Sequence, residues 1–205
     1  MTTVALIDYG MGNLRSVRNA LEILGATAFI ASTEADLQRA DRAILPGVGA
    51  FGDAMKNLHE RGWVGPLTTF AMEQKKPFLG ICLGMQLLAT TGTEFGEHKG
   101  LGWFDGVVRK LAVPVEIRVP HMGWNDVTVV QSTGLLQGVA PRATCYFVHS
   151  FAFEATDASV VTGTTEYGGT TFVSVIEREN VFGAQFHPEK SQKHGLAILK
   201  RFLEV

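Results

Sequence analysis

Short apolar runs alternate with helical patterns through the N-terminal half of the chain, and no other feature limits the fold as strongly. Leu14, Val17 and Leu21 recur at helical spacing in the first of the helical segments, and Gly25 is expected to end that helix. The runs typical of strands cover residues 4–10, 27–32, 42–47 and 77–82. Because strands that alternate with helical crossovers run parallel to one another, this order predicts an α/β fold with a central, mostly parallel sheet flanked by helices.

From about Asp105 the pattern changes to short strands separated by turns. The strand-like runs cover residues 107–111, 126–131, 143–151, 160–167, 170–177 and 181–186. A closing helix is expected after Ser191, its predicted N-cap. This half therefore predicts an antiparallel or mixed contribution to the sheet structure. Since no repeat or linker interrupts the chain, residues 1–205 are expected to form a single domain.

The composition narrows the function classes. Of the 205 residues, 46% are apolar and 19% are charged, which suits an ordinary globular core. A formal charge of -2 with scattered basic residues disfavours binding to nucleic acid or to an anionic membrane. No apolar run approaches the roughly 20 residues that span a bilayer, so we expect a cytoplasmic protein. Two cysteines are too few for a disulfide framework or a Cys-rich zinc site, and no metal or cofactor is expected.

One of those cysteines lies in a setting that suits a nucleophile. The sequence GICLG, residues 80–84, places Cys82 between two glycines where a buried strand is expected to meet a helix. The glycines permit a tight turn, the helix N-terminus favours the thiolate of Cys82, and the backbone N–H of Leu83 becomes an oxyanion donor. The alternative is a small core residue, the role we assign to Cys145 in its strand-like run.

A thiolate nucleophile needs a base, and the base needs an acceptor that orients it. His187 and Glu189 lie two residues apart directly after the run VFGAQF, with Pro188 between them. A carboxylate at this spacing can reach one imidazole nitrogen while the other faces the thiol. Taken alone, this pair could be part of a surface turn. The catalytic interpretation depends on the presence of Cys82 as a candidate nucleophile.

Three segments together resemble the class I glutamine amidotransferases, also called triad glutaminases: LPGVG (45–49), GICLGMQLL (80–88) and QFHPEKS (185–191). The resemblance covers nearly the whole chain, and it implies a triad of Cys82, His187 and Glu189. It also implies oxyanion donors in the backbone amides of Val48 and Leu83. The glutamine contacts that it implies are Gly49, Gln86, Tyr146, Ser150 and Phe151, the last at a position usually occupied by tyrosine in this family.

Within that family the chain resembles most the glutaminase subunits of imidazole glycerol phosphate synthases, enzymes of histidine biosynthesis. The segments that carry this resemblance are IDYGMGN (7–13), PGVGAFG (46–52), VPHMGWN (119–125), YFVHSF (146–151) and EKS (189–191). It implies a heterodimer with a cyclase subunit, a (β/α)8 barrel. The residues expected to face that partner are Asn13, Pro120, Met122, Trp124 and Lys190.

The segment PHMGWN does not have the pattern of a regular core strand, because His121, Gly123 and Asn125 interrupt its apolar residues. Exposure at a protein interface and burial in the core are equally consistent with Met122 and Trp124.

The expected reaction is hydrolysis of glutamine through a Cys82 thioester, with the ammonia passed to the cyclase. Three alternatives remain open. The chain could serve a different synthase, be a non-catalytic α/β module that retains a cysteine, or be a thiol peptidase, because the same triad logic serves proteolysis.

Overall fold

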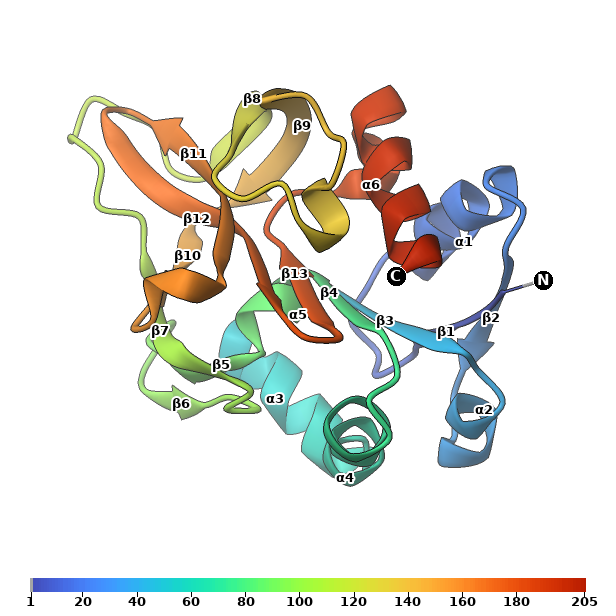
Figure 1. Cartoon of the computed structure of the whole chain (residues 1–205). Helices are drawn as coiled ribbons and strands as arrows, with labels where there is room; N and C mark the ends of the chain where they lie inside the picture. Colours follow the sequence, from blue (N-terminus) through green and yellow to red (C-terminus); the bar gives the residue numbers. More distant parts are fainter. Residues whose placement is uncertain (1) are drawn as a thin grey trace.

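Parallel strands form one half of a nine-stranded sheet in the computed structural model, which describes residues 2–205 (Figure 1). They lie side by side in the order β2-β1-β3-β4-β13. Their bounds are β1 (Thr3–Ile7), β2 (Thr27–Ala31), β3 (Arg42–Gly47), β4 (Phe78–Cys82) and β13 (Val181–Ala184). Every residue of β4 and β13 is buried, as expected for central strands covered by helices on both faces. The strands predicted in the N-terminal half are thus confirmed.

Antiparallel strands from the C-terminal half extend the same sheet in the order β13-β12-β11-β8-β9. Their bounds are β8 (His121–Val129), β9 (Arg142–His149), β11 (Val161–Tyr167) and β12 (Thr170–Arg178). Short connections force this direction: β11 and β12 are joined by Gly168 and Gly169, whose φ angles of +60° and +79° suit a two-residue hairpin turn.

The predicted fold class is confirmed as α/β with an antiparallel contribution from the C-terminal half. One detail differs from the expectation. The antiparallel strands continue the central sheet, so it contains four parallel and four antiparallel neighbouring pairs and is not mostly parallel. The reason is that β13 pairs with β4 on one side and β12 on the other, which joins the two halves edge to edge.

Residues 121–125 of the segment PHMGWN form the first part of β8, which is not a regular core strand because one of its faces is exposed. Residues from His121 onward pair continuously with β9. The strand alternates in burial because its two faces meet different surroundings: His121 is buried, whereas Met122 and Trp124 are 63% and 49% exposed. The strand is hard to predict from sequence because a polar side chain faces inward and apolar side chains face outward.

A second sheet of four strands, in the order β10-β7-β5-β6, lies beside the first. Its bounds are β5 (Ala89–Gly92), β6 (His98–Lys99), β7 (Phe104–Lys110) and β10 (Phe151–Ala155). The helix that follows Cys82, α5 (Leu83–Gln86), is a single turn, since β5 already begins three residues after its end. This small sheet brings the loop after β5 and the start of β10 toward the end of β4.

Helices cover both faces of the large sheet (Figure 1). On one face lie α1 (Leu14–Ile23) and α6 (Gln192–Glu204), and on the other lie α3 (Phe51–Glu60) and α4 (Val64–Thr68). The remaining elements are α2 (Glu34–Gln38), the π-helical turn η1 (Thr69–Glu73) and the 3-10 turns η2 (Gly134–Leu136), η3 (Ala158–Val160) and η4 (Pro188–Lys190). No helix within residues 2–205 combines the length and the apolar character needed to cross a membrane.

The first helix follows its sequence closely. The Asn13 side chain accepts a hydrogen bond from the Ser16 N–H at 3.3 Å, and Gly25 follows the helix with a φ of +82°. At α6, Ser191 occupies the predicted N-cap position, but its hydroxyl does not cap the helix. It donates instead to the carbonyl oxygen of His187 at 2.6 Å.

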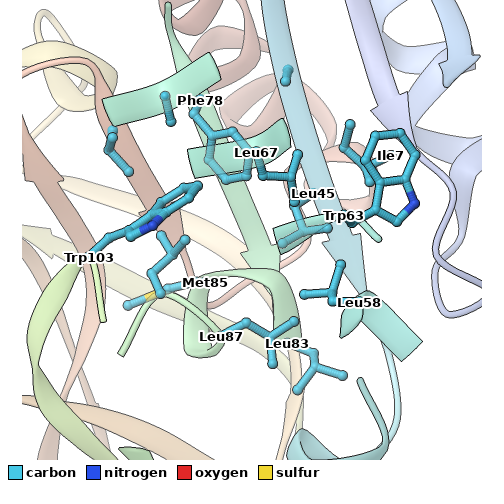
Figure 2. Close-up of a cluster of buried hydrophobic side chains, with 14 of the residues drawn as sticks. Ile7, Leu45, Leu58, Trp63, Leu67, Phe78, Leu83, Met85, Leu87 and Trp103 are labelled. Atoms are coloured by element: carbon cyan, nitrogen blue, oxygen red, sulfur yellow. The ribbon is translucent and has the colours of Figure 1, made fainter. Parts of the chain in front are cut away.

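The core beneath α3 and α4 anchors the turn that carries Cys82. Figure 2 shows Leu83, Met85 and Leu87, all from the segment that follows this turn, in a cluster with Phe78 and Trp103. The rings of Phe78 and Trp103 meet edge to face with centroids 4.9 Å apart. Apolar contacts on this side therefore fix α5 against the sheet, even though the helix is too short to be stable by itself.

Candidate active site

The junction of β4 and α5 forms a strained turn with Cys82 at its apex. Cys82 has φ +55° and ψ -111°, a conformation that a residue with a side chain adopts rarely. Such strain costs about 1–3 kcal/mol and persists only where the surroundings impose it. Here the imposing contacts are backbone contacts: a Cβ on Gly80 would lie 2.5 Å from the Gly84 carbonyl oxygen, and a Cβ on Gly84 would overlap the Leu45 carbonyl oxygen. The two glycines are thus required for the close approach.

The shortness of α5 changes the expected electrostatics of this turn. A helix dipole sums over aligned peptide units, and α5 contains only residues Leu83–Gln86. The helix N-terminus therefore contributes little to stabilising a Cys82 thiolate, and neighbouring side chains must contribute most of that stabilisation.

His187 and Glu189 lie together at the end of β13, beside this turn. The Nδ1 atom of His187 lies 2.9 Å from Oε1 of Glu189, and their side chains are only 3% and 1% exposed. Since a carboxylate accepts, Nδ1 carries the proton. His187 Nε2 is buried and has no hydrogen-bond partner among the described residues, so it is available to exchange a proton with a nearby group.

The backbone holds His187 in place through β9. The His187 N–H donates to the Tyr146 carbonyl oxygen at 2.9 Å, and the Tyr146 N–H donates to Ser191 Oγ at 2.9 Å. Because Ser191 Oγ also donates to the His187 carbonyl oxygen, a closed loop of hydrogen bonds fixes the His-Pro-Glu turn to the strand.

A cavity of about 320 Å³ opens above Cys82 and His187. It has the size of a site for a small polar molecule. Most of the predicted substrate and oxyanion residues line it, together with the cysteine and the histidine: Val48, Gly49, Cys82, Leu83, Gln86, Ser150, Phe151 and His187. Pro120, predicted at the partner surface, lines the cavity as well. The fold thus brings together residues from five separate parts of the sequence.

Tyr146 lies elsewhere. Its ring packs edge to face on Trp124 with centroids 5.9 Å apart, and the Lys190 ammonium lies 5.8 Å from its centroid. It does not line the cavity, so within residues 2–205 the Tyr146 side chain belongs with the predicted partner surface and only its backbone supports the site. Asn13 has the local role described above, as the cap of α1.

Four residues near the cysteine were not predicted as site residues. Glu94, Val148 and His149 line the cavity, and Gln185 donates from Nε2 to Cys82 Sγ at 3.7 Å. The Phe51 N–H donates to Glu94 at 2.9 Å, which ties the loop after β5 to the start of α3. The sequence carries no local signal for Glu94, because it lies among polar loop residues and only the second sheet brings it to the site.

A family model of the glutamine amidotransferases of class I matches residues 5–205. This chain belongs to that family. In this amidotransferase the match spans the turn at Cys82, the His-Pro-Glu turn and both halves of the sheet. The family membership inferred from the three sequence segments is therefore confirmed.

Curated relatives of this amidotransferase share nearly half of its residues. It is 46% identical over 202 residues to "Imidazole glycerol phosphate synthase subunit HisH 1" of Campylobacter jejuni strain RM1221, covering 98% of this chain and 100% of that one. It is 49% identical over 203 residues to "Imidazole glycerol phosphate synthase subunit HisH" of Aquifex aeolicus, covering 98% and 96%. Among solved structures, PurLQS from Thermotoga maritima aligns with a TM-score of 0.78 at 19% identity over 99% of this chain and 98% of that one, a likeness of fold.

The electrostatics around the histidine suit this amidotransferase. Burial by itself lowers the pKa of His187, but the neighbouring Cys82 sulfur and Glu189 carboxylate outweigh burial and raise the pKa to about 9. His187 is thus protonated at neutral pH, and an imidazolium next to a cysteine stabilises its thiolate.

Proposed function

We propose that the chain is the glutaminase subunit of an imidazole glycerol phosphate synthase, an enzyme of histidine biosynthesis. It hydrolyses glutamine to glutamate and ammonia, and it passes the ammonia to a cyclase subunit. The observation that carries this proposal is the cavity in which Cys82 and His187 meet with Glu189 behind the histidine, in a chain 46% to 49% identical to subunits of that synthase. Residues 1–205 act as one domain in this role.

The reaction uses Cys82, His187 and Glu189 as a triad. At neutral pH the proton of the Cys82 thiol already resides on His187 Nε2, and the Cys82 thiolate attacks the side-chain amide carbon of glutamine. The backbone N–H groups of Val48 and Leu83 stabilise the oxyanion, and His187 then gives its proton to the departing ammonia. Water, deprotonated by His187, attacks the γ-glutamyl thioester through a second oxyanion, and glutamate leaves as the thiolate is restored. Glu189 keeps Nδ1 protonated and oriented throughout.

The cavity supports glutamine as the substrate. Glu94 is the one carboxylate among the described residues that line it, and a carboxylate there attracts the α-ammonium group of an amino acid. The remaining contacts come from Gly49, Gln86, Ser150 and Phe151 at the walls. At position 151 the carbonyl oxygen is already engaged with Gln86 at 2.8 Å, a contact that does not need the hydroxyl of a tyrosine.

The partner surface is formed by the outward face of β8 and its neighbours. Met122 and Trp124 are 63% and 49% exposed, and Tyr146 with Lys190 continues this face. Aromatic and methionine side chains are enriched at protein interfaces. We place a (β/α)8 cyclase here in a heterodimer, with Pro120 at the cavity entrance facing it. Both cysteines are unpaired, which suits the reducing cytoplasm where we expect the complex to act.

The test compares two nitrogen sources in the reconstituted synthase. C82A with its cyclase partner is expected to lose glutamine-dependent synthesis by on the order of 10³-fold or more, while synthesis from free ammonium persists. C145A is the matched control, because Cys145 is buried on β9 away from the cavity, and it should retain both activities. Glutamine-dependent synthesis that survives in C82A would refute the triad, and activity only with a different synthase would refute the proposed partner.

A further inference from the structure

We propose that Gln185 is a positioning residue for the nucleophile, which holds the Cys82 sulfur in its thiolate form through an N–H···S hydrogen bond. Gln185 follows β13 directly and is completely buried. Its Nε2 donates to Cys82 Sγ at 3.7 Å, and its Oε1 accepts from Gln86 Nε2 at 2.9 Å. The inference rests on the proposed function, since it concerns how the same nucleophile is prepared.

The orientation of the Gln185 amide follows from its neighbour. Gln86 Nε2 lies 2.8 Å from the Phe151 carbonyl oxygen and 2.9 Å from Gln185 Oε1. A carbonyl oxygen only accepts, so the Gln86 nitrogen must occupy this place and donate to both. With its oxygen engaged by Gln86, Gln185 must present its nitrogen to the sulfur. Rotating the Gln185 amide by half a turn would set two N–H groups against each other and an oxygen against the sulfur.

A buried histidine pair fixes the far end of this chain of hydrogen bonds. His149 Nδ1 lies 2.9 Å from the Phe151 carbonyl oxygen and is therefore the donor, which leaves Nε2 to accept from His121 Nδ1 at 3.1 Å. His121 Nε2 in turn accepts from Asn125 Nδ2 at 3.2 Å. Burial lowers the pKa of each histidine to about 4, so both are neutral and keep these tautomers.

Each donor therefore has one possible direction: His149 and Gln86 both donate to the Phe151 carbonyl oxygen. Gln86 also donates to Gln185, and Gln185 donates to the sulfur. Five elements, β8, β9, β10, α5 and the end of β13, supply these groups, so the packing of both sheets fixes the final N–H. Hydrogen bonding to the charged form of a group favours that form. Since α5 is a single turn, Gln185 supplies a donor that the short helix does not.

The chemical step that this supports is simple. The S–H bond of Cys82 breaks, the proton moves to His187 Nε2, and the electron pair stays on the sulfur, where the Gln185 N–H stabilises it. No further reactant is needed. A purely structural Gln185, which only satisfies the Gln86 amide, would leave this equilibrium unchanged when replaced by an apolar side chain of the same length.

The test measures alkylation of Cys82 by iodoacetamide from pH 5 to pH 10. Q185M is expected to move the inflection to higher pH, so that the rate near pH 6 falls about tenfold while the rates converge at high pH. S174A is the matched control: Ser174 is buried on β12, its carbonyl oxygen accepts from the Gln185 N–H, and its hydroxyl lacks a partner among the described residues. C82A supplies the background, since burial raises the pKa of Cys145 to about 12.

One further variant keeps the result decisive. Q86L leaves Gln185 in the chain but removes the donor that orients it, and a smaller shift in the same direction is expected; this variant serves if Q185M does not fold. Superimposable alkylation profiles for the folded variant and the native chain would overturn the proposal. Because the readout is thiol reactivity, a native chain without glutaminase activity would refute the proposed function and still report on Gln185.

Discussion

Gly84 packs so closely against Leu45 that a Cβ on the glycine would overlap the leucine carbonyl oxygen. G84A is therefore expected to push α5 away from β3 and to lower the free energy of unfolding by about 1–3 kcal/mol, with loss of glutaminase activity because Cys82 moves. G65A is the matched control, since no atom lies within 4 Å of its Cβ and Gly65 is helical. Urea unfolding of both variants measures the difference, and equal stabilities would contradict the assignment of Gly84 as a packing requirement.

Protonation of His187 links stability to alkaline pH. Its folded pKa of about 9 lies above the ordinary value of 6.5. The stabilising contribution is thus fully present below pH 6.5 and is lost as the pH rises through 9. A shift of this size corresponds to about 3 kcal/mol. We expect the free energy of unfolding to fall between pH 6.5 and 9 in the native chain and much less in H187Q. Parallel curves for the two chains would show that His187 is not protonated in the folded state.

In the proposed reaction, Glu189 acts through His187. E189Q retains the shape of the side chain but removes the charge that fixes the proton on Nδ1, so the glutaminase kcat is expected to fall by on the order of 10²–10⁴-fold. Measured rates with saturating glutamine and the cyclase present test this, with E166Q on the distant end of β11 as the control. A kcat within a factor of two of the native value would remove Glu189 from the triad.

The neutral pair of His121 and His149 makes the protein less stable as the pH falls, whereas His187 makes it less stable as the pH rises. His121 and His149 have folded pKa values of about 4, so the unfolded chain binds more protons between pH 6.5 and 4. Stability is therefore lost on acidification over this range, by about 1.4 kcal/mol per pH unit for each histidine. H121Q should show a shallower decline from pH 6.5 to 5 in denaturant titrations, whereas H59Q, at an exposed position, should match the native slope.

The exposed face of β8 predicts how the cyclase binds. W124A removes the largest exposed aromatic side chain there and is expected to weaken binding by about 2 kcal/mol, which is about 30-fold in Kd. V130A, 55% exposed beyond the far end of the same strand, serves as the control. Calorimetric titration with the cyclase distinguishes them, and an unchanged Kd for W124A would place the partner on another surface.

The parts of the site that the sequence predicted are those whose chemistry is local. Glycines on both sides of Cys82 predict a tight turn, and the structure has this turn. A histidine two residues from a carboxylate at a strand end predicts a hydrogen-bonded pair, and the structure has the His187–Glu189 contact. The strands of the N-terminal half were equally predictable, because buried parallel strands form continuous apolar runs.

The rest depended on which strands become neighbours. Pairing of β13 with both β4 and β12 cannot be read from either run alone, and it decides that the sheet is half antiparallel. Glu94 and Tyr146 show the same limit: the second sheet carries one into the cavity, and the alternation of β9 turns the ring of the other outward. Gln185 gave no signal because a polar residue in an apolar run has no specific partner until the fold supplies Gln86 and Cys82.

The positive φ angle of Cys82 lowers the stability of the folded protein, although the cysteine side chain is needed for the proposed reaction. Glycine is the residue that relaxes at a φ of +55°, so C82G should be a more stable protein than the one that carries the nucleophile. Selection for glutamine use is then the force that keeps a side chain at this position, and drift toward glycine would be thermodynamically downhill once that selection ended. Glycine in place of this cysteine in a descendant would therefore indicate that the descendant no longer hydrolyses glutamine.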